Sequence, residues 1–335
     1  MNTTTKKRIE IQERDVDILQ AILAMRYVTA DHMATLFPST TAAPVINPGG
    51  TFRGGAEAIA KRLGKLAQFG YLFRIGSDIR RPHEPAVYTL GEESVKLLSE
   101  QRGYDAALID DQLRMVRKYL ASRSDNKHFN IEHRLGINSF RIALAIALRG
   151  HPDADWLYHE NGSPFWVEPT SSNGLTVSVT VKTQDIPTIA KQYLKPTEST
   201  HTITRAPDAF FILDLNGHHI GYLYEKDRGT EAHAVIAAKL TCYYHWYRQQ
   251  LNRNVFGTKH LRVLIETEST QRIENMIQWG AFKVKDTGAG IFWFTTTDAI
   301  TLENPHRVLE PIWTIGHRDH VQNKHSLIEF TPQQA

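Results

Sequence analysis

Cysteine is almost missing from this chain of 335 residues, which contains Cys242 and no other. One cysteine can form neither an intramolecular disulfide nor a zinc site built on paired cysteines, so the sequence fits a reducing compartment. Long apolar runs are missing as well, since no segment approaches the ~20 apolar residues of a membrane span and residues 1–10 lack the core of a signal peptide. We therefore expect a cytoplasmic protein without a membrane partner.

Several catalytic motifs are absent too. The sequence has no Gly-rich phosphate loop of the P-loop or dinucleotide type and no Gly-x-Ser-x-Gly elbow, which argues against NTPases and serine hydrolases. The histidines, among them His128 and His133, lack the spacing of a zinc-binding helix, and we assign no metal to them. A net charge of +3 is only mildly basic, so composition alone does not establish a nucleic-acid partner.

The first third of the chain predicts three helices followed by a hairpin. Apolar residues recur at helical spacing over 14–26 and 56–69, and Thr29 is a predicted N-cap for a helix over 30–37. Alternating strands over 71–75 and 86–90 then enclose a polar turn. This order is that of a winged helix-turn-helix, which seats its third helix in the major groove of DNA and places its hairpin on phosphates.

Positive charge is concentrated in the third helix and the hairpin. Between Gly49 and Arg81 the basic residues outnumber the acidic ones by five. We predict that DNA is contacted by Arg53, Lys61, Arg62, Lys65, Arg74, Arg80 and Arg81. The alternative is a protein-docking module in which these cations only solvate an exposed face.

A boundary is predicted near residues 122–127, which gives domains over 1–121 and 122–335. The helical pattern over 92–120 indicates a linker, or else a dimerisation arm that would make a homodimer. From Phe129 the predicted order is helix, three strands, helix and strand, with a polar insertion over 161–206 that contains one strand near 175–182. The chain is therefore predicted to be an α+β multidomain protein whose second domain is of α/β type.

Three carboxylates fall on neighbouring strands of the second domain. Asp208 heads an apolar strand, and after the turn at Asn216-Gly217 the next strand ends in Glu225 and Asp227, which face the same side. Such a cluster would bind Mg²⁺ or Mn²⁺. The alternative is structural: Asp208 caps a turn, and the other two carboxylates pair with Arg205 or Arg228.

The order of elements and the Pro207-Asp208 and Glu225 positions resemble the restriction-endonuclease-like, or PD-(D/E)XK, fold. That resemblance implies catalytic roles for Asp208, Glu225, Asp227 and Lys239. The family's lysine position holds Asp227 here, and Lys226 must face the opposite side, so Lys239 on the following helix is the substitute. Glu132 matches an acidic residue that some members carry on the preceding helix.

Motifs along residues 14–315 resemble the replication-relaxation family in the same order. They are Asp15-Val-Asp-Ile-Leu, Arg62-Leu-Gly-Lys-Leu-Ala-Gln-Phe-Gly-Tyr-Leu, Val87-Tyr-Thr-Leu-Gly, Pro207-Asp-Ala-Phe-Phe, Glu225-Lys-Asp-Arg-Gly-Thr-Glu and Pro311-Ile-Trp. The resemblance implies a DNA-binding accessory protein of a plasmid or other mobile element, acting in replication, relaxation or conjugative transfer beside other mobile-element proteins. The alternatives are a metal-dependent endonuclease and a winged-helix transcriptional regulator.

Overall fold

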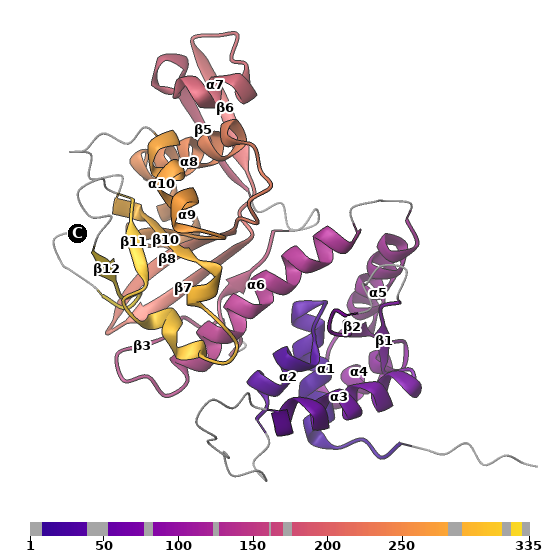
Figure 1. The fold of residues 1–335 in the computed structure, drawn as a ribbon. Coiled ribbons are helices and arrows are strands. Elements are labelled where there is room, and N and C mark those ends of the chain that lie inside the picture. The colour runs from indigo at the N-terminus through magenta and orange to yellow at the C-terminus, as the bar shows by residue number, and fades with distance from the viewer. Residues whose placement is uncertain are drawn as a thin grey trace, which may run out of the picture. The chain divides into compact units, whose positions relative to one another are not determined.

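The computed structural model describes residues 9–38, 53–76, 83–122, 127–160, 162–169, 176–280, 290–316 and 323–329. It divides the chain into two compact units, residues 1–142 and 143–335, whose elements are drawn in Figure 1. Helices and strands are mixed, as the expected α+β class requires. Within the described ranges, every helix is too short or too polar to span a bilayer.

The first unit contains three helices, a hairpin and two further helices before the long helix α6. Its elements are α1 (Glu13–Met25), α2 (Ala30–Leu36), α3 (Arg53–Gln68), β1 (Leu72–Arg74), β2 (Tyr88–Leu90), α4 (Glu93–Arg102), α5 (Ala106–Ala121) and α6 (Lys127–Leu148). The strands β1 and β2 are antiparallel, with Leu72 opposite Leu90. The predicted helices and hairpin are therefore present at the predicted places, with ends that differ by a few residues.

The start of α2 shows how local sequence sets an element. Thr29 is the N-cap: its hydroxyl accepts from the backbone N–H of His32, and its own N–H donates to Nδ1 of His32 at 3.2 Å. Burial lowers the pKa of His32 to about 4, so the ring is neutral and Nδ1 is free to accept. The proton then lies on Nε2, which is 3.0 Å from Oγ of Ser139 on α6.

A buried ion pair joins α1 to α3. Asp15 lies on the inward side of α1, and its carboxylate accepts from Nε of Arg62 at 2.7 Å, from a second guanidinium nitrogen and from the backbone N–H of Gln12 at 2.8 Å. Arg62 also donates to the carbonyl of Glu10 at 2.8 Å. The pair fixes the position of α3 against α1 because a buried carboxylate requires its partners.

The division between the two compact units falls inside α6, between Ile142 and Ala143. The first half of α6 belongs to the first unit through its side chains. Asn138 donates to the carbonyls of Met25 and Tyr27 at 3.1 and 2.7 Å, and Ile131 and Leu135 share an apolar cluster with Tyr27. A continuous helical pattern in the sequence gives no sign of where such packing changes.

The second unit is built on one large sheet. Its elements are β3 (Ala154–Trp156), β4 (Trp166–Val167), β5 (Val177–Lys182), η1 (Thr183–Asp185), α7 (Thr188–Leu194), β6 (Thr200–Arg205), β7 (Ala209–Leu215), β8 (His218–Lys226), α8 (His233–Arg248), α9 (Asn252–Phe256), β9 (Leu261–Thr267), α10 (Thr270–Trp279), β10 (Phe292–Thr296), η3 (Thr297–Ala299), η4 (Pro305–Leu309), β11 (Trp313–Ile315) and β12 (Lys324–His325). The strand order is β12-β11-β10-β9-β8-β7-β3, and β4 also pairs with β7.

The centre of this sheet is parallel, because β9 runs parallel to both β8 and β10. Every residue of β9 is buried, as is usual for a parallel strand covered on both faces. The helices α8 and α10 lie over one face, where they contact inward-facing residues such as Phe210, Leu223 and Val263 (Figure 1). The helices α8 and α10, which follow β8 and β9 in the chain, therefore lie next to the side chains at the carboxyl ends of these strands.

The hairpin β7–β8 turns at Asn216-Gly217. Both residues have positive φ, 52° and 83°, the conformation that a two-residue turn of this type requires and that Asn-Gly favours. The region over 161–206 contains more structure than the single strand predicted: β5 pairs with β6 in a separate two-stranded sheet, and α7 lies between them in sequence. Leu175 itself lies outside the described residues.

The Asp15–Arg62 pair yields a stability prediction. Arg62→Ala leaves the Asp15 carboxylate buried with only one backbone donor, so we expect unfolding of the first unit to lose roughly 1–3 kcal/mol. The change should be followed by far-ultraviolet circular dichroism during urea unfolding. All six tryptophans lie in residues 143–335 and report the second unit by fluorescence, which should be unaffected.

Lys61→Ala is the matched control. Lys61 neighbours Arg62 on α3, but its pair with Glu57 is exposed, with side-chain accessibilities of 76% and 70%. Exposed pairs contribute little, so no measurable change is expected. Equal effects of the two substitutions would show that the Asp15–Arg62 pair does not stabilise the unit.

Candidate functional site

The carboxyl end of β8 brings three consecutive charged residues into the interior. Glu225, Lys226 and Asp227 are all buried, with 6%, 8% and 9% of their surface exposed. Successive side chains of a strand point to opposite faces, so Glu225 and Asp227 lie toward the helices and Lys226 lies on the other face. Buried charges require partners, and each of the three has a different one.

Glu225 is held by α8. The Tyr243 hydroxyl donates to one carboxylate oxygen, and Nζ of Lys239 donates to the other at 3.0 Å. Lys239 also pairs with Glu231 at 2.9 Å, so its ammonium bridges two carboxylates. Lys239 and Tyr243 are four residues apart, which places both on the face of α8 that meets the sheet.

Burial and neighbouring charges shift the pKa values of Glu225, Lys239 and Tyr243. Burial raises the pKa of Glu225 to about 7, and the repulsion from Asp208 adds to it, while Lys239 and Tyr243 offset part of the effect. Burial alone would lower the pKa of Lys239, but the charges of Glu225, Glu231 and Asp208 outweigh it and the pKa is raised. Burial and the adjacent Glu225 also hold the pKa of Tyr243 well above its ordinary value, so Lys239 stays charged and Tyr243 stays neutral.

Asp208 lies beside this group, at the start of β7. One of its carboxylate oxygens accepts from the backbone N–H of Lys226 at 2.7 Å, and its own N–H donates to the carbonyl of Tyr224 at 3.0 Å. Its charge acts on both Glu225 and Lys239. The structure therefore brings together three of the four residues predicted to be catalytic: Asp208, Glu225 and Lys239.

Asp227 is engaged elsewhere. Arg272 on α10 donates to both of its oxygens, from Nε at 2.5 Å and from a terminal nitrogen at 2.9 Å, and the Thr267 hydroxyl donates at 2.5 Å. The pairing expected from the sequence as the structural alternative was with Arg205 or Arg228. The observed partner is 45 residues away along the chain, and no local pattern in the sequence pointed to it.

These contacts decide how a metal would fit. Asp208, Glu225 and Asp227 do not gather ligand atoms within 4.8 Å of one another; in the part of the chain that the structure describes, the set that does so is Glu84, His128 and Glu132. The oxygens of Asp227 are occupied by a guanidinium and a hydroxyl, so Asp227 does not fit a Mg²⁺ or Mn²⁺ site. Asp208 and Glu225 are the remaining pair.

Lys226 takes part in a network on the opposite face. Its Nζ donates to Glu266 on β9 and lies 3.0 Å from Oγ1 of Thr297, and the Tyr224 hydroxyl donates to Glu266 at 2.6 Å. As the strand alternation requires, the ammonium of Lys226 is directed away from Glu225. Lys226 therefore forms its ion pair with Glu266 of the neighbouring strand and not with Glu225 or Asp227.

The predicted DNA-binding residues differ in their surroundings. Lys61 and Lys65 on α3 and Arg74 on β1 are exposed, whereas Arg62 is held by Asp15. The side chain of Arg53, and all of Arg80 and Arg81, lie outside the described residues. A cluster of three exposed cations thus remains on α3 and the adjacent strand of the hairpin.

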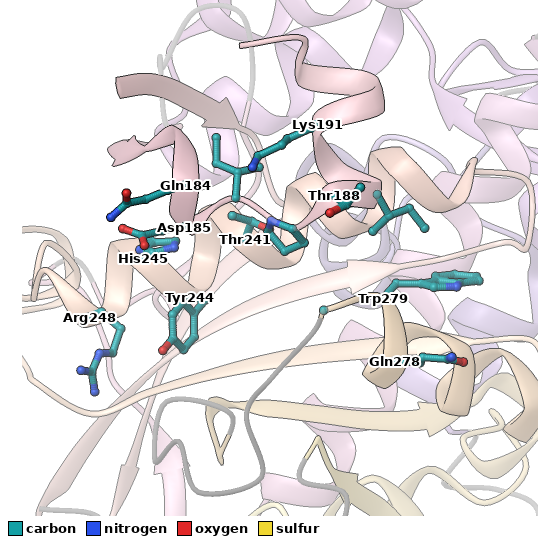
Figure 2. A pocket seen from close by; sticks show the side chains of 14 residues that line it. Gln184, Asp185, Thr188, Lys191, Thr241, Tyr244, His245, Arg248, Gln278 and Trp279 are labelled. Carbon is teal, nitrogen blue, oxygen red and sulfur yellow. The ribbon is translucent and has the colours of Figure 1, made fainter. Parts of the chain in front are cut away.

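A cleft of about 910 Å³ lies between the η1–α7 segment and α8, and the end of α10 completes its wall (Figure 2). Basic side chains reach it from Lys191, His245 and Arg248, and aromatic rings line it at Tyr244 and Trp279. No sequence motif predicts this cleft, because its lining comes from three segments whose proximity depends on how α7 packs on α8.

The raised pKa of Glu225 predicts a pH dependence of stability. In the unfolded chain this carboxyl loses its proton near pH 4.5, and in the folded chain near pH 7. The folded state therefore holds an extra proton between these values, so stability falls as the pH rises through this window. Glu225→Gln keeps the shape and removes this titration.

Wild type and Glu225→Gln should be unfolded in urea from pH 4.5 to 8 and followed by tryptophan fluorescence. The difference between their unfolding free energies should change in favour of Glu225→Gln by up to about 1.4 kcal/mol per pH unit within the window. Glu274→Gln, an exposed residue on α10, is the control and should run parallel to wild type. Parallel curves for Glu225→Gln as well would contradict the raised pKa.

A search of curated proteins and a search of solved structures each found no match. Residues 19–259 match the family described as replication-relaxation, which covers most of the first unit and the second unit as far as the segment before β9. The resemblance carried by the sequence motifs is thereby confirmed, and the chain belongs to the replication-relaxation family.

Proposed function

We propose that this chain is a DNA-binding accessory protein of a plasmid or other mobile element, acting in replication, relaxation or conjugative transfer. Family membership supports a role in plasmid or mobile-element replication or relaxation and implies interaction with DNA. In this proposal the first unit is a winged helix that selects the DNA site. The second unit is a restriction-endonuclease-like domain that adds DNA contacts or assembles with other mobile-element proteins.

The observation that carries the proposal is the exposed cation cluster formed by Lys61, Lys65 and Arg74. A winged helix needs a third helix whose outer face reaches the major groove and a hairpin that follows directly, and α3 and β1–β2 have this order. Lys61 and Lys65 are four residues apart and so share one face of α3. Both side chains are exposed, and the pair of Lys61 with Glu57 is a weak surface pair with which phosphates can compete.

In the second unit one observation argues against cleavage. The β7–β8 hairpin, the parallel strands β8, β9 and β10 and the helices between them are the arrangement expected of a nuclease-like domain. Asp208, Glu225 and Lys239 lie together near the carboxyl end of β8, and this observation favours an endonuclease as the second candidate. Against it stands Asp227, whose charge is balanced by Arg272 and not available to a metal ion.

A metal in that second candidate would be held by Asp208 and Glu225 and would supply a Lewis acid for the attacked phosphate. Lys239 would then position Glu225. A transcriptional regulator remains the third reading, because a winged helix serves that role equally well. It differs from the leading proposal in binding specifically near its own gene.

The cation cluster predicts a salt-dependent affinity. Replacing Lys61 and Lys65 together with alanine should weaken binding to duplex DNA by about tenfold to one hundredfold at ~0.1 M salt, since each phosphate contact releases counterions. The slope of log affinity against log salt should flatten by about 0.9 per lost contact. Fluorescence anisotropy over a salt series measures both.

Lys96→Ala is the matched control for this pair. Lys96 is an exposed lysine on α4 that pairs with Glu100, and it lies outside the proposed DNA face. It should leave affinity and slope at wild-type values. Unchanged binding by the Lys61, Lys65 double variant would contradict the assignment of α3 as the recognition helix. Arg62 is not substituted in this experiment because its pair with Asp15 stabilises the fold.

Cleavage is tested with supercoiled plasmid and single-stranded DNA in Mg²⁺ or Mn²⁺. We expect a gel shift without nicking, both for wild type and for an Asp208→Ala, Glu225→Ala double variant, because Asp227 is held by Arg272. Nicking by wild type that the double variant loses would establish the endonuclease instead. Circular dichroism of the double variant shows whether it is folded.

A further inference from the structure

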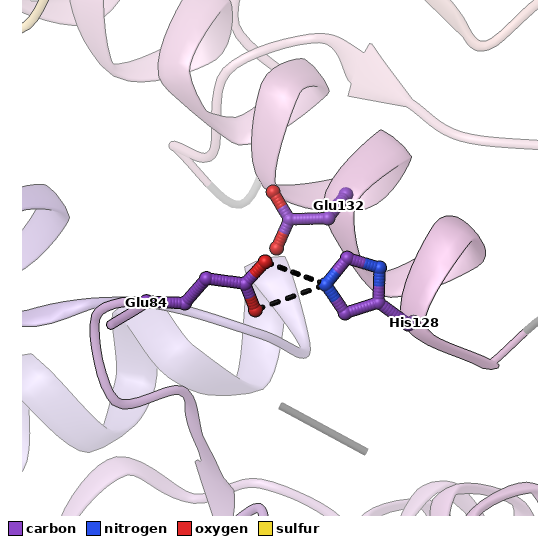
Figure 3. A group of neighbouring side chains, drawn as sticks. All are labelled: Glu84, His128 and Glu132. Carbon is purple, nitrogen blue, oxygen red and sulfur yellow. Dashed lines mark hydrogen bonds and ion pairs between the residues drawn. The ribbon is translucent and has the colours of Figure 1, made fainter. Parts of the chain in front are cut away.

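Glu84, His128 and Glu132 converge in the first unit from two separate segments. His128 and Glu132 are four residues apart in the first turns of α6 and so lie on one face of the helix, while Glu84 precedes β2 (Figure 3). Nε2 of His128 is 2.8 and 2.9 Å from the two carboxylate oxygens of Glu84. One ligand atom from each of the three residues lies within 4.8 Å of the other two.

We infer that these three side chains form a binding site for a divalent transition-metal ion of the Zn²⁺ type, although His128 is one of the histidines to which the sequence pattern assigned no metal. An imidazole nitrogen with two carboxylate oxygens is a donor set suited to Zn²⁺, and three protein ligands leave at least one coordination position open. Mg²⁺ prefers an all-oxygen shell and is disfavoured by the nitrogen ligand. The inference does not depend on the proposed function.

The donor atoms of the group are of the kinds that bind a cation. Two carboxylates approach one imidazole, so the three side chains carry a formal charge of −2 when the ring is neutral and −1 when it is protonated. Glu84 and His128 are largely buried, with side-chain accessibilities of 16% and 29%, which limits the screening of that charge by water. A divalent ion neutralises both carboxylates and replaces the contact between the ring and Glu84.

The backbone segments that carry the ligands are fixed by packing. Val87, three residues after Glu84, lies in the same apolar cluster as Ile131 and Leu135 of α6. Zn²⁺ at ~2.0–2.2 Å from each of its ligands places the ligand atoms roughly 3.5 Å apart, and the ligand atoms of these three residues lie within 4.8 Å of one another. An ion here would tie the segment before β2 to the start of α6.

The test uses the full chain after removal of metal with a chelator. Isothermal titration with Zn²⁺ and elemental analysis should give one ion per chain, and Co²⁺ should produce a visible d–d absorption band. His128→Ala and Glu132→Gln should each lose at least tenfold in Zn²⁺ affinity and should lose the Co²⁺ band. Glu84→Gln is the second carboxylate variant in case one of the others fails to fold.

Two controls separate this site from other acidic groups. Glu329→Gln alters a His–Glu pair of the same four-residue spacing, His325–Glu329, and Glu225→Gln alters the edge of β8; both should bind Zn²⁺ like wild type. Zinc at one hundred times its Kd should also raise the thermal midpoint of wild type by roughly 5–10 °C but not that of Glu132→Gln. Absence of a bound ion, equal binding by all variants, or loss confined to Glu225→Gln would each overturn the site.

Discussion

The carboxyl end of β8 places a negative, a positive and a negative side chain in succession inside the protein, and their pairing constrains much of the second unit. Glu225 pairs with Lys239 on α8, Lys226 with Glu266 on β9, and Asp227 with Arg272 on α10. Removing water from each charge costs several kcal/mol, which only a well-placed partner offsets. A shift of α8 or α10 along the sheet would leave a buried carboxylate without its partner. The pairs therefore stabilise one position of these helices relative to β8.

The same pairs determine what chemistry the edge of the sheet can support. A metal-dependent nuclease leaves its carboxylates unbalanced so that the ion supplies the positive charge. Here an arginine and a lysine from the protein supply it, since Arg272 holds both oxygens of Asp227 and Lys239 contacts Glu225. The charge of these carboxylates is therefore balanced from within the protein, by side chains of α8 and α10.

Local structure was predictable from the sequence because its signals are local. Thr29 caps α2, Asn216-Gly217 forms the turn of the β7–β8 hairpin, and the alternation along β8 separates Lys226 from its two acidic neighbours, as the residue pattern predicts. The short strands β6, β11 and β12 were not predicted, since two to six residues give little periodicity. The sequence pattern also does not show the division within α6, because it depends on which side chains of the helix pack on the first unit.

The sequence could not predict which residues pair with the buried charged side chains. Arg272 is 45 residues from Asp227, and Asp15 is 47 from Arg62, so both pairs depend on tertiary packing. The consequence is largest for Arg62, whose position beside Lys61 suggested an outward role, although its guanidinium is held by a buried carboxylate. Lys61 and Arg62 are neighbours on one helix, yet the first has an exposed partner and the second a buried one, so position in the sequence does not distinguish an accessible charge from one used in folding.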